Sequence, residues 1–188
     1  MKKILFIIII TLSKVINAQT VSLEFMAQCR ADPSVCVENV EYVKDINNLL
    51  NKYVGTWKGT FDGKNYEFNF IKKENVERGS SGIRWDRLIG RVKITDQNGI
   101  VEYDNFNKPD SEANLGDNFY KDLTVYLTIF SGAKVGCIDY GYLNLRIKPE
   151  TPNNMTISFV PDNDIVKQDC TNFQTTIPTS VKINLTKQ

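Results

Sequence analysis

Hydrophobic and polar residues alternate along most of the chain after residue 52. The alternation is clearest in the segment 66–71, where aromatic side chains at every second position alternate with polar ones. A period of two residues predicts β-strands with one buried and one exposed face. The pairs Asp62-Gly63 and Asn98-Gly99 separate such segments and are typical of two-residue hairpin turns, because these residues tolerate a positive φ. Eight strands are expected, at 53–61, 66–71, 85–95, 100–103, 119–130, 138–147, 155–159 and 181–185.

The order of these strands indicates the fold class. No helical pattern interrupts them, so a mainly β fold is predicted, an antiparallel up-and-down β-barrel of about eight strands. The polar segment 105–118 is expected to be the longest loop. The strand at 119–130 is expected to be central, because both of its faces carry bulky residues. An eight-stranded barrel has an interior that holds either packed side chains or one small ligand.

One helix is expected before the barrel. The pair Asp32-Pro33 is typical of a helix start, with the aspartate as N-cap and the proline at the first helical position. Apolar residues then recur every three to four positions from Val37 onward, which predicts a helix with one buried face. This helix is expected to end near Leu50.

Residues 1–18 have the features of a signal peptide. Lys2 and Lys3 precede an unbroken apolar run, and Ala18 is the small residue before the expected cleavage site. The run is shorter than the about 20 apolar residues that span a bilayer as a helix. No cysteine follows the cut to carry a lipid anchor. We therefore expect an exported bacterial protein, periplasmic or extracellular, with neither a membrane span nor a lipid anchor.

The expected cleavage also changes the charge. The removed segment holds three lysines and no acidic residue, so the formal net charge falls from +1 to −2. Such a chain lacks the basic surface that binds nucleic acids or anionic lipids, and no nucleic-acid partner is expected. The mature chain is expected to comprise an N-terminal arm at 19–36, with a weak strand signal at 21–25. A single β-barrel domain at 37–188 would include the helix.

The mature chain keeps four cysteines, which in an exported protein favours two disulfides over free thiols. We favour Cys29–Cys36, which closes a small N-terminal loop, and Cys137–Cys170, which ties a strand to a late loop. The two other pairings need the N-terminal arm to reach the far end of the chain, and they remain open.

The segment that starts the first long strand, Val54-Gly55-Thr56-Trp57, resembles the lipocalin and fatty-acid-binding-protein superfamily. The first strand of those barrels carries a Gly-x-Trp motif after a short helix that closes the barrel bottom. The resemblance implies that Trp57 packs at the closed end and that Gly55 allows a close backbone approach. It also implies a basic residue that pairs with the tryptophan, for which Lys182 or Arg146 is available.

The chain is also similar to a family of small exported flavobacterial proteins of unknown function. The similarity rests on Ala18-Gln19 at the end of the signal peptide, on the Val-Gly-Thr-Trp strand, and on an Asp86-x-x-x-Gly90 stretch before the second hairpin. It covers 54–105 and implies no activity.

The absence of histidine excludes several kinds of chemistry. Neither a Ser-His-Asp triad nor the usual His-bearing zinc sites can be built, and no glycine-rich phosphate loop is present. No metal and no cofactor are therefore expected. The acidic stretch 162–164 could offer oxygen ligands to calcium, but it lacks the glycine and the closing glutamate of an EF-hand loop. We interpret it as a turn.

Acidic pairs could still support glycoside hydrolysis. Asp86, Asp104 and Asp139 lie near aromatic residues in predicted strands. We expect them to point outward on a partly solvated sheet, and no catalytic residue is assigned.

Aromatic residues are the strongest candidates for ligand contacts, since small-molecule sites are mostly apolar with a few polar groups. In a filled barrel the same residues would be core. Arg78, Arg84 and Arg87 cluster around one Gly/Ser turn and are candidate anion contacts, although such arginines usually pair with nearby acidic residues. The candidate ligand-contacting residues are Trp57, Phe61, Tyr66, Phe68, Phe70, Trp85, Tyr140 and Tyr142.

Three functional hypotheses follow. The first is a non-enzymatic binder that holds a small apolar or amphipathic molecule inside the barrel. The second is a protein–protein interaction or inhibitor module with a filled barrel, whose partner would be an envelope protein. The third, least favoured, is a carboxylate-based hydrolase. A cavity inside the barrel would separate the first from the second, and converging buried acids would separate the third from both.

Overall fold

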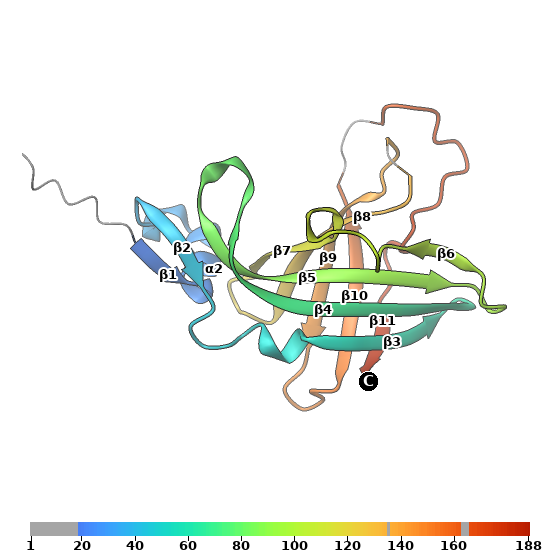
Figure 1. Ribbon diagram of the computed structural model, residues 1–188, viewed down its shortest axis with the longest axis horizontal. Coiled ribbons are helices and arrows are strands. Elements are labelled where there is room, and N and C mark those ends of the chain that lie inside the picture. Colours follow the sequence, from blue (N-terminus) through green and yellow to red (C-terminus); the bar gives the residue numbers. More distant parts are fainter. Residues whose placement is uncertain (1–18, 135, 163–165) are drawn as a thin grey trace, which may run out of the picture.

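The computed structural model describes residues 19–134, 136–162 and 166–188, and its ribbon is drawn in Figure 1. The predicted signal peptide at 1–18 lies outside the described residues. Within the described ranges the chain forms one α-helix, α2 (Leu23–Ala31), and eleven strands. The strands are β1 (Gln19–Ser22), β2 (Val40–Lys44), β3 (Gly55–Phe61), β4 (Lys64–Glu77), β5 (Arg84–Thr95), β6 (Val101–Asp104), β7 (Asn114–Phe119), β8 (Val125–Ser131), β9 (Tyr140–Ile147), β10 (Asn154–Pro161) and β11 (Ile183–Lys187). Short 3-10 turns are η1 (Pro33–Val35), η2 (Asn51–Tyr53), η3 (Gly79–Ser81) and η4 (Asp110–Glu112).

Eight of the strands close into an antiparallel barrel. Their order around the barrel is β5-β4-β3-β11-β10-β9-β8-β7, and the pairing of Gly90 on β5 with Asn114 on β7 completes the ring. Because β6 lies outside the ring, each barrel strand pairs with the barrel strands that come before and after it in the sequence, and β3 pairs with β11. The topology is therefore up-and-down. The predicted fold class is confirmed.

The membership of the ring differs from the prediction. The strand expected at 100–103 is β6, which pairs with β5 outside the ring. The eighth barrel strand is β7, which lies in the segment 105–118 predicted to be a loop, and the strand expected at 119–130 is split between β7 and β8. β7 escaped recognition because it is polar. Asp117 binds arginines from other elements, and Gly116 leaves room for the hydroxyl of Tyr126.

Alternation along β3, β4 and β8 directs large aromatic side chains into the barrel. Trp57, Phe68 and Phe70 have no exposed surface. The rings of Phe68 and Phe70 stack with their centroids 6.1 Å apart, and the rings of Phe130 and Phe159 meet edge to face at 5.4 Å. The rings therefore pack against one another and form the core.

Residues 19–44 form an N-terminal unit at one end of the barrel, on the left in Figure 1. β1 pairs in parallel with β2, and β2 pairs in parallel with β5 at the end of the β4–β5 hairpin. The side chain of Ser22 caps α2 by accepting a hydrogen bond from the backbone N of Phe25 at 3.1 Å. α2 packs against β7, so the unit is joined to the barrel on two strands.

The prediction of one helix before the barrel is confirmed, but its predicted position is wrong. α2 lies in the segment 19–36, which was predicted to be an arm with a weak strand signal, and 33–50 forms η1, β2 and turns. The apolar spacing in that segment does not produce one buried face. Val43 is fully buried against the barrel, whereas Val37 and Ile46 are 39% and 56% exposed.

Asp45 favours a turn at the place where the predicted helix would continue to Leu50. Its buried carboxylate accepts hydrogen bonds from the backbone N of Leu49 at 2.7 Å and of Leu50 at 3.1 Å, and the ammonium of Lys72 lies 2.9 Å away. An aspartate that binds nearby backbone amides favours a turn over a helix.

The opposite end of the barrel, which we call the mouth, carries the β3–β4 hairpin and the connections from β8 to β9 and from β10 to β11 (Figure 1). The disulfide Cys137–Cys170 joins these two connections, while Cys29–Cys36 closes a loop in the N-terminal unit. The favoured pairing of the four cysteines is confirmed.

Candidate functional site

The structure separates the eight candidate aromatic residues into three groups. Trp57, Phe68 and Phe70 are core, and Phe61 and Tyr66 lie at the mouth, where Tyr66 is 2% exposed and forms the end of the core. Trp85 is 3% exposed beside the N-terminal unit, Tyr140 is 46% exposed, and Tyr142 is half-buried beside Arg30 of α2. The candidates therefore do not converge on one interior site.

A hollow of about 390 Å³ opens at the mouth. Phe61 and Tyr66 form one side, and the segment 173–179 forms the other. The sequence alone did not single out Phe173, because it lies in an irregular connection with no periodic pattern. The residues that line this mouth hollow are Phe61, Asp62, Lys64, Tyr66, Phe173, Gln174, Thr175, Thr176, Pro178 and Thr179.

A buried carboxylate fixes the irregular wall of the mouth hollow. Asp139 is 3% exposed and accepts hydrogen bonds from the backbone N of Thr176 at 2.8 Å and from its hydroxyl at 2.7 Å. The same hydroxyl accepts a hydrogen bond from the backbone N of Ala133 at 2.9 Å. The Nζ of Lys134 lies 5.7 Å from the ring centre of Phe173. With the disulfide nearby, these contacts hold the wall in one arrangement.

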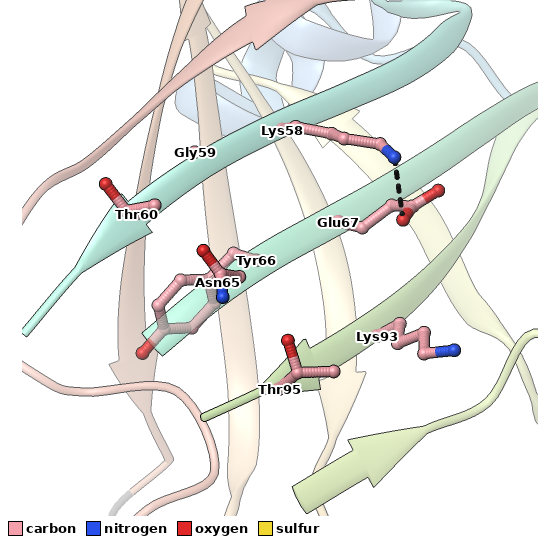
Figure 2. Close-up of a pocket in the computed structure, with 8 residues that line it drawn as sticks. All are labelled: Lys58, Gly59, Thr60, Asn65, Tyr66, Glu67, Lys93 and Thr95. Atoms are coloured by element: carbon pink, nitrogen blue, oxygen red, sulfur yellow. Dashed lines mark ion pairs between the residues drawn. The ribbon is translucent and has the colours of Figure 1, made fainter. Parts of the chain in front are cut away.

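A second hollow, of about 450 Å³, lies on the outer face of β3, β4 and β5, and Figure 2 shows its lining. It is polar, and the ammonium of Lys58 pairs with Glu67 at 3.2 Å. Gly59 is part of its lining, and a Cβ atom there would clash with the backbone O of Asn184 in β11, so glycine lets the two strands approach. Tyr66 lines this hollow as well as the mouth hollow.

The electrostatics around Tyr66 keep its hydroxyl neutral. Burial raises the pKa of Tyr66 to about 12, and the nearby carboxylates of Glu102 and Asp62 add to the rise. Lys64 pairs with Glu102 at 2.6 Å, which balances the charge on the rim. Among the described residues, no hydrogen bond links the Tyr66 hydroxyl to another side chain. This phenol can therefore donate a hydrogen bond to a ligand in the hollow.

The closed end has the arrangement that the lipocalin resemblance implied, with one change. Trp57 is buried and donates its indole N–H to the backbone O of Tyr53 at 2.8 Å. The basic residue beside its ring is Lys187 of the last strand, whose Nζ lies 5.3 Å from the ring centre. The expectation of Lys182 or Arg146 in this place is wrong. The eight-stranded antiparallel ring is consistent with a calycin-like fold.

Gly55 makes room at this closed end for a side chain, not for the close backbone approach that was expected. Its φ of +124° favours glycine, and a Cβ atom there would lie 3.1 Å from Cε of Lys187. The absence of a Cβ atom at Gly55 lets the side chain of Lys187 lie over the ring of Trp57.

The candidate anion contacts divide between two places. Arg78 pairs with Asp117 of β7, and Arg87 donates hydrogen bonds from Nε at 2.9 Å and Nη2 at 2.5 Å to the backbone O of Gly116. Arg84 instead donates to the backbone O of Asn75 in its own hairpin at 3.2 Å. Arg30 of α2 joins the first group, and sequence reasoning missed it because no local pattern links it to β7.

The three acidic residues near aromatic positions are not brought together. Asp86 accepts hydrogen bonds at the end of the barrel that carries the N-terminal unit, and Asp139 does so at the mouth. The expectation of an outward, partly solvated side chain is confirmed for Asp104 and wrong for Asp86 and Asp139, which are 1% and 3% exposed. Asn163 and Asp164 lie outside the described residues, so the interpretation of 162–164 as a turn rather than a calcium site stays a prediction.

In the part of the chain that the structure describes, no helix has both the length and the apolar character needed to cross a membrane.

Comparison with known proteins places the chain in a family. No curated protein and no solved structure matches the chain. One family model matches residues 1–148, well over half of the sequence. The chain therefore belongs to DUF6705, a family of unknown function.

Proposed function

We propose that the protein is an exported, non-enzymatic binding module that takes a small amphipathic molecule at the mouth of its barrel. The observation that carries the proposal is the mouth hollow, whose lining includes Phe61 of β3, Tyr66 of β4 and Phe173 of the β10–β11 connection. The barrel interior is a poorer candidate, because aromatic side chains of the core fill it.

The lining of the mouth hollow indicates the character of the ligand. The rings of Phe61 and Phe173 offer apolar area, Tyr66 is 2% exposed, and most of the lining consists of hydrogen-bonding residues, which are Asp62, Lys64, Gln174 and three threonines. Polar groups that surround a smaller apolar area suit a ligand that has both kinds of surface. The protonated hydroxyl of Tyr66 adds one more donor.

Pre-organisation supports a binding role. The Asp139–Thr176 hydrogen bonds and the Cys137–Cys170 disulfide hold the segment that carries Phe173 before any ligand arrives. A site that is already ordered loses less conformational entropy on binding.

Export is part of the proposal. The signal-peptide features of residues 1–18 and the similarity to exported flavobacterial proteins support it. Two disulfides are compatible with an oxidising compartment outside the cytoplasm.

The test begins with native mass spectrometry of the mature protein purified from its own host's envelope fraction, followed by denaturing extraction. We expect a reproducible small molecule released on unfolding. The neutral fluorophore N-phenyl-1-naphthylamine then serves as a probe of defined chemistry, and we expect saturable binding that the released molecule displaces.

Phe173→Ala is the variant and Val160→Ala is its matched control. Phe173 lines the mouth hollow, whereas Val160 is a half-exposed apolar residue on β10 that does not line it. We expect loss of probe binding in Phe173→Ala alone. Equal binding by both variants, or no saturable binding by the wild type, would contradict the proposal.

A further inference from the structure

Three arginines from separate parts of the chain surround one buried carboxylate where the N-terminal unit meets the barrel. Arg30 of α2 donates to one oxygen of Asp117 at 2.5 Å, and Arg78, just after β4, donates to the other. Arg87 of β5 binds the backbone O of Gly116, the residue before Asp117. We call these four side chains the arginine cluster.

Positive charge exceeds negative charge in the arginine cluster. The side chain of Asp117 is 1% exposed and both of its oxygens are already engaged, while Arg87 is 4% exposed and, within the described residues, hydrogen-bonds to a neutral carbonyl alone. Two guanidinium groups thus share one carboxylate, and the third, that of Arg87, is the buried one. Burying a charge without a counter-charge is costly. Burial lowers the pKa of Arg87, and the nearby charge of Arg78 contributes to that lowering.

A buried donor without a partner lies beside the same cluster. Trp85 is 3% exposed, and among the described residues its indole N–H has no hydrogen-bond partner. The guanidinium of Arg78 lies 4.5 Å from the centre of its ring. Buried tryptophans usually find an acceptor for this group, so an unsatisfied donor adjoins the arginine cluster on its buried side.

The arginine cluster is open on one side. The side chains of Arg30 and Arg78 are 45% and 35% exposed, although each spends one nitrogen on Asp117. Their remaining N–H groups are within reach of solvent. The planar fork of a guanidinium matches the oxygens of a phosphate group and can bind two of them at once.

We propose that the arginine cluster binds a phosphate group, held between Arg30 and Arg78 on the solvent side of Asp117. The group would be carried by a free small molecule or by a lipid headgroup, since both present the same oxygens. The site lies at the opposite end of the barrel from the mouth hollow, so it does not depend on the function proposed above.

The test titrates the mature protein with inorganic phosphate, against sodium chloride of equal ionic strength. Tryptophan emission reports on the site because Trp85 lies under Arg78, and the midpoint of thermal unfolding gives a second readout. We expect a saturable change in emission and a rise in the midpoint with phosphate alone. A parallel arm measures co-sedimentation with vesicles of phosphatidylcholine, with and without phosphatidylglycerol. Phosphate binding assigns a free ligand, and co-sedimentation only with anionic vesicles assigns a headgroup.

Three variants separate a binding role from a structural one. Arg30→Gln removes a half-exposed donor and should weaken phosphate binding about tenfold. Asp117→Asn removes the competing negative charge with little change in shape, and should tighten binding. Arg84→Gln is the matched control, because that arginine lies in the same hairpin without touching Asp117. Far-ultraviolet circular dichroism checks that each variant folds.

The outcomes are opposed. Weaker binding in Arg30→Gln together with wild-type binding in Arg84→Gln supports the proposal. A phosphate response no larger than the chloride response, with no preference for anionic vesicles, overturns it. A response that Arg30→Gln leaves unchanged also overturns it, and then the cluster serves only to join α2 to β7.

Discussion

Removal of the buried carboxylate of Asp86 should lower the stability of this protein substantially. The carboxylate is 1% exposed and accepts three hydrogen bonds, from the hydroxyl of Tyr42 and from the backbone N of Asp45 at 2.9 Å and of Asn75 at 3.0 Å. The donors come from β2, the turn after it, and β4. One side chain of β5 therefore joins the N-terminal unit to the longest hairpin of the barrel.

The expected loss follows from those bonds. A hydrogen bond to a charged acceptor contributes about 1.5–3 kcal/mol, and breaking a buried charged network costs about 3–5 kcal/mol because its partners stay desolvated. We expect Asp86→Ala to lower the free energy of unfolding by about 4 kcal/mol. The whole free energy of unfolding of a domain is about 5–15 kcal/mol, so the variant should approach the limit of stable folding.

The assay is urea-induced unfolding of the mature protein, followed by circular dichroism and by tryptophan emission. Asp104→Ala is the matched control, since Asp104 is an exposed carboxylate 3.6 Å from Lys93 on the neighbouring strand. Exposed pairs contribute about 0–1 kcal/mol. If Asp86→Ala and Asp104→Ala were destabilised by the same amount, the reasoning about this network would be refuted.

Three further predictions concern other parts of the molecule. Replacing Cys137 and Cys170 by serine should lower the free energy of unfolding by about 4 kcal/mol, against about 2 kcal/mol for Cys29 and Cys36. The reason is that the separations are 33 and 7 residues, and a longer closed loop restricts the unfolded chain more; urea-induced unfolding of each double-serine variant measures the difference. Lys187→Met should cost about 1 kcal/mol and alter the emission of the tryptophan beneath it. The free energy of unfolding should fall as pH rises from about 10 towards 12, because the pKa of Tyr66 is about 10 in the unfolded chain and about 12 in the folded protein, so the unfolded chain ionises first. Tyr66→Phe should lessen that fall, which unfolding curves at a series of alkaline pH values measure.

The parts of the fold that were predictable are those with strictly local causes. The hairpin at Asp62-Gly63 depends on two neighbouring residues at positive φ, and the alternation from Tyr66 to Phe70 depends on one buried face. The second hairpin was predicted at the right place but with the wrong turn, because the chain turns over Asp96–Ile100 and has a positive φ at Gly99 alone of the predicted pair. Local patterns of this kind need no knowledge of the partner strand.

The errors arise where distant contacts decide the local structure. Between residues 33 and 50 the apolar spacing suits a helix, but β2 gains parallel pairing with β5 and the buried carboxylate of Asp45 closes a turn. β7 appeared to be a loop because Asp117 is polar, and its arginine partners come from elements 39 and 87 positions away. Tertiary contacts therefore override local preference in both cases.

The same cause explains which candidate residues were missed. Phe61 and Tyr66 could be proposed from strand parity, but Phe173 reaches the mouth hollow from an irregular connection. Lys187 lies beside Trp57 only because β11 pairs with β3 across the closure of the barrel. No spacing within the sequence predicts either contact.

That closure has a consequence for how the protein is made. The first and last strands of the ring pair with each other, Lys58 opposite Thr186 and Trp57 opposite Lys187. A chain synthesised from its N-terminus therefore completes β3 to β10 while the outer edge of β3 has no partner. Contacts between such distant residues make folding slow, and unpaired edges promote association with other chains. The interval before β11 emerges is thus the period in which this protein most needs protection by a chaperone.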